Sequence, residues 1–107
     1  MLQVAEMSFQ VIEELRPLVE AVRKRDRSLA DQLQRAASSV ALNIAEAQKS
    51  DAGNQRARFF TAAGSASESR AALRVAVGWR YIAPEQGEKA RGLLEQVIAI
   101  LWKLTHR

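Results

Sequence analysis

The chain has 107 residues, of which 48% are hydrophobic and 26% are charged, and it carries a formal net charge of +4 and no cysteine. This length fits one domain covering residues 1–107, and the lack of cysteine excludes disulfides and thiolate metal sites. The first residues do not form a basic stretch followed by an apolar core, and no apolar run is long enough to span a bilayer. We therefore expect a cytoplasmic protein with no membrane partner.

The first predicted helix covers residues 2–25, because its apolar residues recur on one face at ~100° per residue. Pro17 lies inside this helix. A proline in a helix interior removes one backbone hydrogen bond and clashes with the preceding turn. We expect a kink near residues 13–17, and two short helices are the less favoured alternative because the apolar stripe stays in phase.

The second predicted helix covers residues 28–49. Ser28 is followed three residues later by Asp31, which resembles a capping box and predicts Ser28 as the N-cap. A polar stripe runs beside the apolar face of this helix at spacings of three and four. Its residues are Gln32, Arg35, Ser39, Asn43 and Glu46.

The third predicted helix covers residues 53–81, and the last covers residues 84–105 with Pro84 in its first turn, where the missing amide costs nothing. Short connections imply that consecutive helices are antiparallel neighbours. The sequence therefore predicts an all-α, up-down four-helix bundle. Gly64 lies in a helix interior, where glycine costs ~1 kcal/mol relative to alanine, so we expect a close helix approach there.

The polar stripe also suggests a contact with the third helix. We expect Arg35 to pair with Glu68, within or between subunits. Ser39, Asn43 and Ser65 would satisfy neighbouring polar groups. An ion pair of this kind specifies the helix register more than it stabilises the fold.

Several large apolar residues lie off the predicted core faces. Exposed apolar surface of this extent usually marks an interface, so we expect self-association. The alternative is a bundle core with unusually wide apolar faces. The expected oligomer-interface residues are Phe9, Val75, Trp79, Ile100 and Trp102.

The middle of the chain is basic, which favours contact with a polyanion such as RNA or DNA. The side chains are expected to position phosphates rather than read bases. No aromatic platform is interleaved with them in the sequence, so sequence-specific single-strand binding is not expected. The candidate nucleic-acid-binding residues are Arg23, Lys24, Arg25, Arg27, Lys49, Arg56 and Arg58.

Catalytic signatures do not occur in the sequence. His106 is the only histidine and lies one residue from the C-terminus, where we expect a frayed surface position. Glu46 and Glu68 could form a carboxylate pair across two helices, but the Glu-x-x-His motifs of bundle metal sites do not accompany them. We expect no enzyme activity, no metal and no cofactor.

Two alanine- and serine-rich stretches carry a resemblance to a known family. They are Arg35-Ala-Ala-Ser-Ser-Val-Ala-Leu-Asn-Ile-Ala-Glu46, and Phe59 to Glu68 with Gly64-Ser65. This pattern resembles the small four-helix-bundle family first noticed in intervening sequences of bacterial 23S ribosomal RNA genes. It is also similar to the accessory variability proteins of diversity-generating retroelements. The chain departs from the family in having Ala47 in place of a usual glycine, with an atypical loop after it.

The resemblance implies a homo-oligomeric ring, most often a pentamer, and a non-catalytic accessory role. It further implies a reverse-transcriptase partner, with structured RNA or its complementary DNA. One alternative is a protein-interaction scaffold whose charge serves only solvation. Another is an orphan passenger of ribosomal RNA inserts with no ribosomal role.

Overall fold

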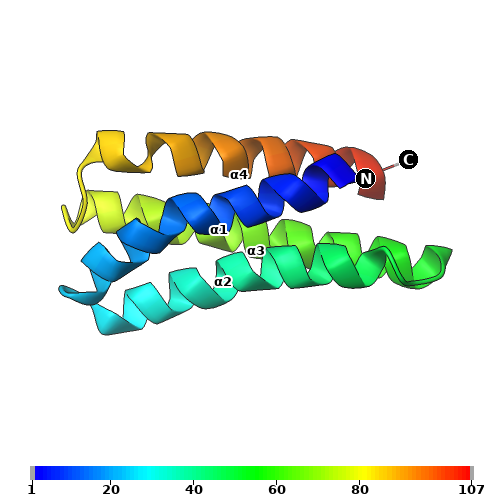
Figure 1. The fold of residues 1–107 in the computed structure, drawn as a ribbon, viewed down its shortest axis with the longest axis horizontal. Coiled ribbons are helices and arrows are strands. Elements are labelled where there is room, and N and C mark those ends of the chain that lie inside the picture. The colour runs from blue at the N-terminus through cyan, green and yellow to red at the C-terminus, as the bar shows by residue number, and fades with distance from the viewer. Residues whose placement is uncertain (1, 107) are drawn as a thin grey trace.

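The computed structural model describes residues 2–106, and within that range the chain forms four helices and no strand. They are α1 (Leu2–Arg23), α2 (Arg27–Ala47), α3 (Ala52–Gly78) and α4 (Pro84–Thr105). The all-α prediction is thus confirmed. In Figure 1 the α1–α2 and α3–α4 connections lie at one end, and the α2–α3 connection lies at the other with the start of α1 and the end of α4.

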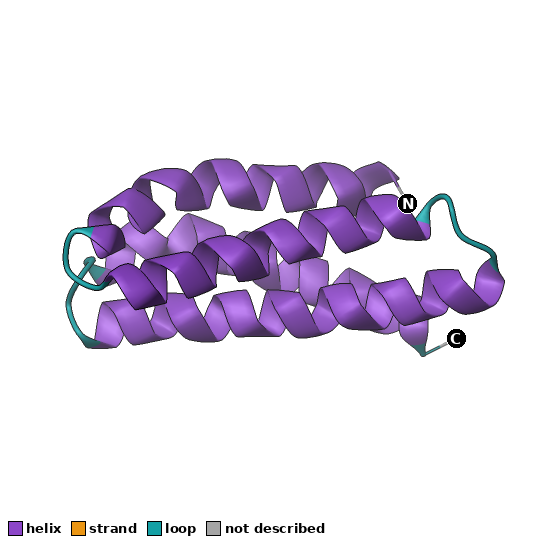
Figure 2. Cartoon of the chain, turned by 90° about the horizontal axis from the view of Figure 1, so that it is seen from below, coloured by secondary structure: helices purple, strands orange, loops and turns teal. Residues whose placement is uncertain are grey.

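Each helix packs against two others, with α1 and α3 each touching both α2 and α4. The molecule is an elongated bundle measuring 42 × 21 × 19 Å, seen along two directions in Figures 1 and 2. Its axis is filled by fully buried aliphatic side chains, which provide most of the driving force for folding. These include Val11, Leu33, Ile44, Leu94 and Leu101.

The α2–α3 seam is the most extensive of the four helix contacts. Small residues such as Ala36, Ala62 and Ala66 are buried along these two helices. Because small side chains let two backbones approach closely, the alanine-rich stretches of the sequence serve this packing. No helix between residues 2 and 106 combines the length and the hydrophobicity that a membrane crossing requires.

The predicted start of α2 was wrong. The helix begins at Arg27, and Asp26 is its N-cap, with an extended backbone (φ −155°, ψ 93°) and a carboxylate that accepts a 3.0 Å hydrogen bond from the Leu29 amide. Ser28 instead lies in the first turn and is exposed. A carboxylate at the cap also interacts favourably with the positive end of the helix dipole, which explains why Asp26 takes this position.

The start of α1 and both ends of α4 match the prediction, and the remaining boundaries differ by one to three residues. α1 ends at Arg23 rather than residue 25, α2 ends at Ala47 rather than residue 49, and α4 covers the predicted range. α1 continues through Pro17 without a break, so the two-helix alternative is excluded. Pro17 is exposed, and Figure 1 shows α1 changing direction in its C-terminal half.

α3 ends at Gly78 rather than at Tyr81 because the chain reverses there in a Schellman turn. The Tyr81 amide donates to the Ala76 carbonyl at 2.9 Å and the Arg80 amide to the Val77 carbonyl at 2.9 Å. Arg80 has the left-handed backbone conformation, with φ 62°, that glycine usually occupies in this turn. The turn cannot be predicted from the sequence, because arginine rather than glycine occupies position 80.

Candidate functional site

The seven predicted nucleic-acid-binding residues divide between the two ends of the bundle. Arg23, Lys24, Arg25 and Arg27 surround the α1–α2 connection, which we call the α1–α2 end. Lys49, Arg56 and Arg58 lie at and just after the α2–α3 connection, which we call the α2–α3 end. Since the bundle is 42 Å long, these residues do not form one continuous surface.

At the α1–α2 end, some charges are already matched within the chain. Arg23 forms an ion pair with Asp31 and donates to the Gln34 side-chain oxygen at 2.6 Å. The hydrogen bond from Arg23 lowers the pKa of the Asp31 carboxyl. The Arg25 guanidinium lies 5.6 Å from the centre of the Tyr81 ring. Lys24, Arg25 and Arg27 are all exposed.

At the α2–α3 end, Arg56 has a structural role. Its guanidinium donates two hydrogen bonds, of 3.1 and 2.9 Å, to the Thr105 carbonyl at the C-terminus of α4. A cation is favoured there by the negative end of the helix dipole. Arg58 donates to the Asn43 side-chain oxygen at 3.3 Å, and Lys49 is exposed.

The polar stripe of α2 makes part of the predicted network. The Ser39 and Ser65 hydroxyl oxygens are 2.7 Å apart across the α2–α3 seam, and the Asn43 side-chain amide donates to the Ser39 backbone carbonyl at 2.9 Å. Among residues 2–106, however, no ion pair links Arg35 to Glu68, and both side chains are exposed. The intrachain form of that prediction is therefore wrong.

Glu46, the last residue of the stripe, is exposed. Gly64 was expected to lie at a close helix approach. It is exposed, and a Cβ atom at this position would meet nothing within 4 Å. The protomer itself therefore gives no steric reason for a glycine there.

Four of the five predicted interface residues are exposed. The exposed fractions are 48% for Phe9, 44% for Val75, 67% for Trp79 and 58% for Trp102. Ile100 is half-buried and packs against the core, so less of its side chain is accessible than in the other four. These side chains do not form one patch. Val75 and Trp79 lie at the C-terminus of α3, near the α1–α2 end, whereas Trp102 lies near the C-terminus of α4, at the α2–α3 end.

Sequence reasoning missed two further exposed apolar side chains, Leu42 on α2 and Phe60 on α3. Leu42 lies between polar residues of α2, and Phe60 follows the buried Phe59. Counting apolar residues on the predicted core face could have identified both as lying outside it. With these two residues added to the predicted ones, each of the four helices has at least one large exposed apolar side chain.

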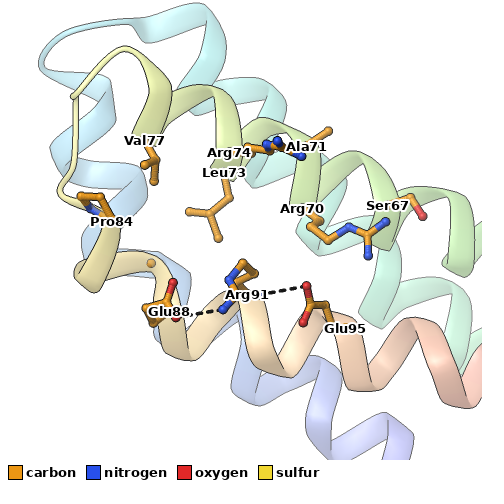
Figure 3. Close-up of a pocket in the computed structure, with 11 residues that line it drawn as sticks. Ser67, Arg70, Ala71, Leu73, Arg74, Val77, Pro84, Glu88, Arg91 and Glu95 are labelled. Carbon is orange, nitrogen blue, oxygen red and sulfur yellow. Dashed lines mark hydrogen bonds and ion pairs between the residues drawn. The ribbon is translucent and has the colours of Figure 1, made fainter.

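A groove of about 580 Å³ runs between α3 and α4 and was not predicted (Figure 3). Leu73, Val77 and the buried Gly87 lie in it, and charged residues from both helices line it. Arg91 bridges Glu88 at 2.8 Å and Glu95 at 3.1 Å, as the dashed lines in Figure 3 show. The Arg91 hydrogen bond lowers the pKa of Glu88.

Arg70 and Arg74 also line this groove, from the α3 side. Both are exposed, and neither forms an ion pair within residues 2–106. They lie outside the basic middle of the sequence, and their spacing of four was the signal that could have identified them.

An aromatic cluster lies on the same face of α3 and α4, at the α2–α3 end. The Trp102 and His106 rings stack with centroids 4.2 Å apart and planes 10° apart, and the Phe60 ring centroid lies 6.0 Å from that of His106. The Arg56 guanidinium lies 5.3 Å from the centre of the Phe60 ring. His106 is exposed, as predicted, but it packs in this cluster rather than fraying. An aromatic cluster therefore does accompany one predicted basic residue, Arg56.

Between residues 2 and 106 no group of three or more His, Cys, Asp or Glu side chains lies together as metal ligands would. The fold and surface thus define the protein as a small helical bundle with exposed aromatic and basic residues at both ends. Comparison with known protein families identifies the family of the chain. The chain belongs to the 23S rRNA-intervening sequence protein family, whose model matches residues 1–103.

A solved structure has the same fold. It is a protein of unknown function from the S23 ribosomal protein family of Bacteroides thetaiotaomicron VPI-5482, determined at 1.70 Å resolution. The two chains are 19% identical, with a TM-score of 0.89 over 97% of this chain and 99% of the other. At this identity the likeness concerns the fold alone. No curated protein matches the chain.

Proposed function

We propose that this protein is a non-catalytic, oligomeric accessory protein that holds nucleic acid by its phosphate backbone. The observation that carries the proposal is the group of exposed cations at the α1–α2 end, namely Lys24, Arg25 and Arg27. Arg80, at the neighbouring α3–α4 connection, is exposed as well. The nearby carboxylates already have other partners, because Asp26 caps α2 and Asp31 pairs with Arg23.

The proposal includes assembly of antiparallel up-down bundles into a ring. A ring requires two different surfaces on each protomer, because its contacts are heterologous. Two separate apolar surfaces of this kind are available. One is formed by exposed Val75 on α3 and Trp79 at its C-cap, and the other by exposed Phe9 on α1. The preference for five copies rests on the family resemblance. A ring would multiply weak phosphate contacts through valency.

The exposed positions of Arg35 and Glu68 support a pair between subunits rather than within one. The test is a double-mutant cycle with Arg35→Ala and Glu68→Ala, read as the dissociation constant of the oligomer. Coupling of about 0.5–3 kcal/mol is expected for residues in contact, and additive effects would reject the pair.

The enzyme partner in this proposal is a reverse transcriptase, with structured RNA or its complementary DNA as the bound nucleic acid. It rests on the resemblance of residues 35–68 to the retroelement accessory proteins. Co-purification of the two proteins on a shared RNA, lost when the RNA is digested or the basic residues are neutralised, is the expected result.

The central experiment compares two variants for binding to labelled structured RNA and duplex DNA at low and physiological salt. Lys24→Gln/Arg25→Gln/Arg27→Gln removes the group at the α1–α2 end, and Arg16→Gln, at an exposed arginine on α1 outside the candidate set, is the control. Each lost duplex phosphate contact should reduce the slope of log K against log salt by about 0.9. Light scattering checks that the oligomer is intact, and unchanged binding by the triple variant would reject the assignment.

A second candidate function is a protein-interaction scaffold without a nucleic-acid role. The exposure of Leu42 and Trp79, each 67%, favours a surface made for protein contact. An intact oligomer that binds neither RNA nor DNA, even at low salt, would select this alternative.

A further inference from the structure

We propose that the face shared by α3 and α4 binds one nucleic-acid strand with unpaired bases. Trp102 and Phe60 would stack on bases, while Arg70 and Arg74 would hold phosphates. This inference rests on the proposed nucleic-acid role but assigns a different surface from the α1–α2 end and a different mode of recognition, base stacking.

The participating residues lie on one face because their spacings follow the helix repeat. On α3, Phe60, Ser67, Arg70 and Arg74 are separated by seven, three and four residues, which keeps them in one line. Contacts tie this line to α4 at both ends. The Arg56 guanidinium bonds the Thr105 carbonyl at 2.9 Å, and at the far end a Cβ on Gly87 would lie 3.5 Å from the Leu73 side chain.

The charges on this face favour a polyanion. Arg91 pairs with both Glu88 and Glu95, so this triad carries one excess negative charge. Arg70 and Arg74 have no ion-pair partner among residues 2–106, and they leave the groove with a net positive charge. Figure 3 shows the Arg70 side chain extending along the groove on the α3 side. A second copy of this chain covering the face would have to desolvate both unpaired guanidinium groups, which costs several kcal/mol per ion.

The aromatic cluster supplies rings on which bases can stack, which a surface of cations alone does not offer. Trp102 is 58% exposed and Phe60 is 46% exposed, although both are large apolar side chains. The His106 ring stacks on one side of the Trp102 indole, with ring centroids 4.2 Å apart. The histidine ring is itself oriented by its Nδ1 atom, which lies 2.9 Å from the Trp102 backbone carbonyl oxygen. Exposed, oriented aromatic rings together with arginines along the same face are a combination that binds single strands.

The dimensions fit a short strand. Phe60 and Arg74 are separated by fourteen residues of α3, which at 1.5 Å per residue is about 21 Å. A stacked strand advances about 3.4 Å per nucleotide, so the face has the length of about six stacked nucleotides.

The test measures binding of labelled oligothymidylate, a matched abasic strand and a duplex to the full chain by fluorescence anisotropy. Wild type should bind the base-bearing strand more tightly than the abasic one. Trp102→Ala should weaken binding of the base-bearing strand by between about fivefold and a hundredfold and leave the abasic strand and duplex unchanged. Oligouridylate in parallel distinguishes RNA from DNA.

Two matched variants separate stacking from simple apolar contact. Trp102→Phe should retain most of the base preference, and Trp102→Leu should lose it although it keeps apolar area. With Trp79→Phe as background, Trp102 is the only tryptophan, so quenching of its fluorescence by oligothymidylate reports stacking directly.

The salt dependence of binding tests the role of Arg70 and Arg74. Arg70→Gln/Arg74→Gln should reduce the salt slope of single-strand binding by about 0.7 for each lost phosphate contact. Arg16→Gln, an exposed arginine on α1, is the control and should leave the slope unchanged.

Three outcomes would overturn the inference. Equal binding of base-bearing and abasic strands with normal duplex binding rejects this face and leaves the proposed function standing. A change in oligomer mass with Trp102→Ala, rescued by Trp102→Leu, would assign Trp102 to the subunit interface instead. Failure to bind any of the three nucleic acids rejects the inference, and failure to bind structured RNA as well rejects the proposed function.

Discussion

Replacing Asp26 with alanine tests how α2 begins. The Asp26 carboxylate accepts hydrogen bonds from the Leu29 amide at 3.0 Å and from the Tyr81 hydroxyl at 3.3 Å. It therefore caps α2 and ties the α1–α2 connection to the α3–α4 connection. Asp26→Ala removes both interactions without touching the core.

The expected loss of stability comes mostly from the cap. Truncating an N-cap aspartate typically costs about 1 kcal/mol, within a range of about 0.5–2 kcal/mol. The Tyr81 bond adds little, because Tyr81 is only half-buried and its hydroxyl can turn to water. A loss of about 1 kcal/mol lowers Tm by roughly 4 °C in a domain of this size.

Thermal unfolding followed by circular dichroism, at one protein concentration for all variants, gives the measurement. Asp26→Asn keeps a capping oxygen and should cost only a few tenths of a kcal/mol. Ser28→Ala should be nearly neutral, because Ser28 is exposed and does not cap the helix. If Ser28→Ala is as destabilising as Asp26→Ala, the assignment of the cap is wrong.

The only tyrosine of the chain gives an independent check. Burial raises the pKa of the Tyr81 phenol, and the charge and hydrogen bond of Asp26 raise it further. In Asp26→Ala the pKa should move down towards its ordinary value while the effect of burial remains. An ultraviolet titration that finds no change would show that the two side chains do not interact.

Three further changes have defined outcomes. Arg80→Gly should raise stability by up to about 1 kcal/mol in thermal unfolding, because it relieves the left-handed conformation at φ 62°, and Arg80→Ala should give no such gain. Gly64→Ala should stabilise the protomer by about 1 kcal/mol in thermal unfolding at low protein concentration, since nothing lies within 4 Å of the new Cβ. Hydrogen bonds from Asn54 lower the pKa of the Asp51 carboxyl. The stability that this carboxylate contributes is therefore present above its ordinary pKa and lost as the pH falls through the lower folded value, so Asp51→Asn should flatten the acid limb of urea stability measured between about pH 5 and pH 2.

Periodicity predicted the helices well because each has a persistent buried face. Leu33 and Ile44 of α2 repeat at helical spacing, and both are fully buried. The ends were less predictable because they depend on single hydrogen bonds. Asp26 and Ser28 are both good cap residues in sequence, and only the backbone conformation decides between them.

The surface was harder to predict because it depends on residues far apart in the chain. Phe60 and His106 meet across the α3–α4 seam, and no local pattern places them together. Conversely, Lys24 and Lys49 belong to one basic segment of sequence but lie at opposite ends of α2. A helix that traverses the whole bundle separates residues that the sequence keeps close.

The separation of the two basic groups has an electrostatic consequence. The bundle is 42 Å long, whereas mobile ions at physiological salt screen a surface charge over about 8 Å. The ends are thus about five screening lengths apart, and the charge at one end contributes almost nothing to the potential at the other. An approaching polyanion does not respond to the formal net charge of +4, but to whichever end it meets. Occupation of one end by a polyanion should leave the attraction of the other end intact.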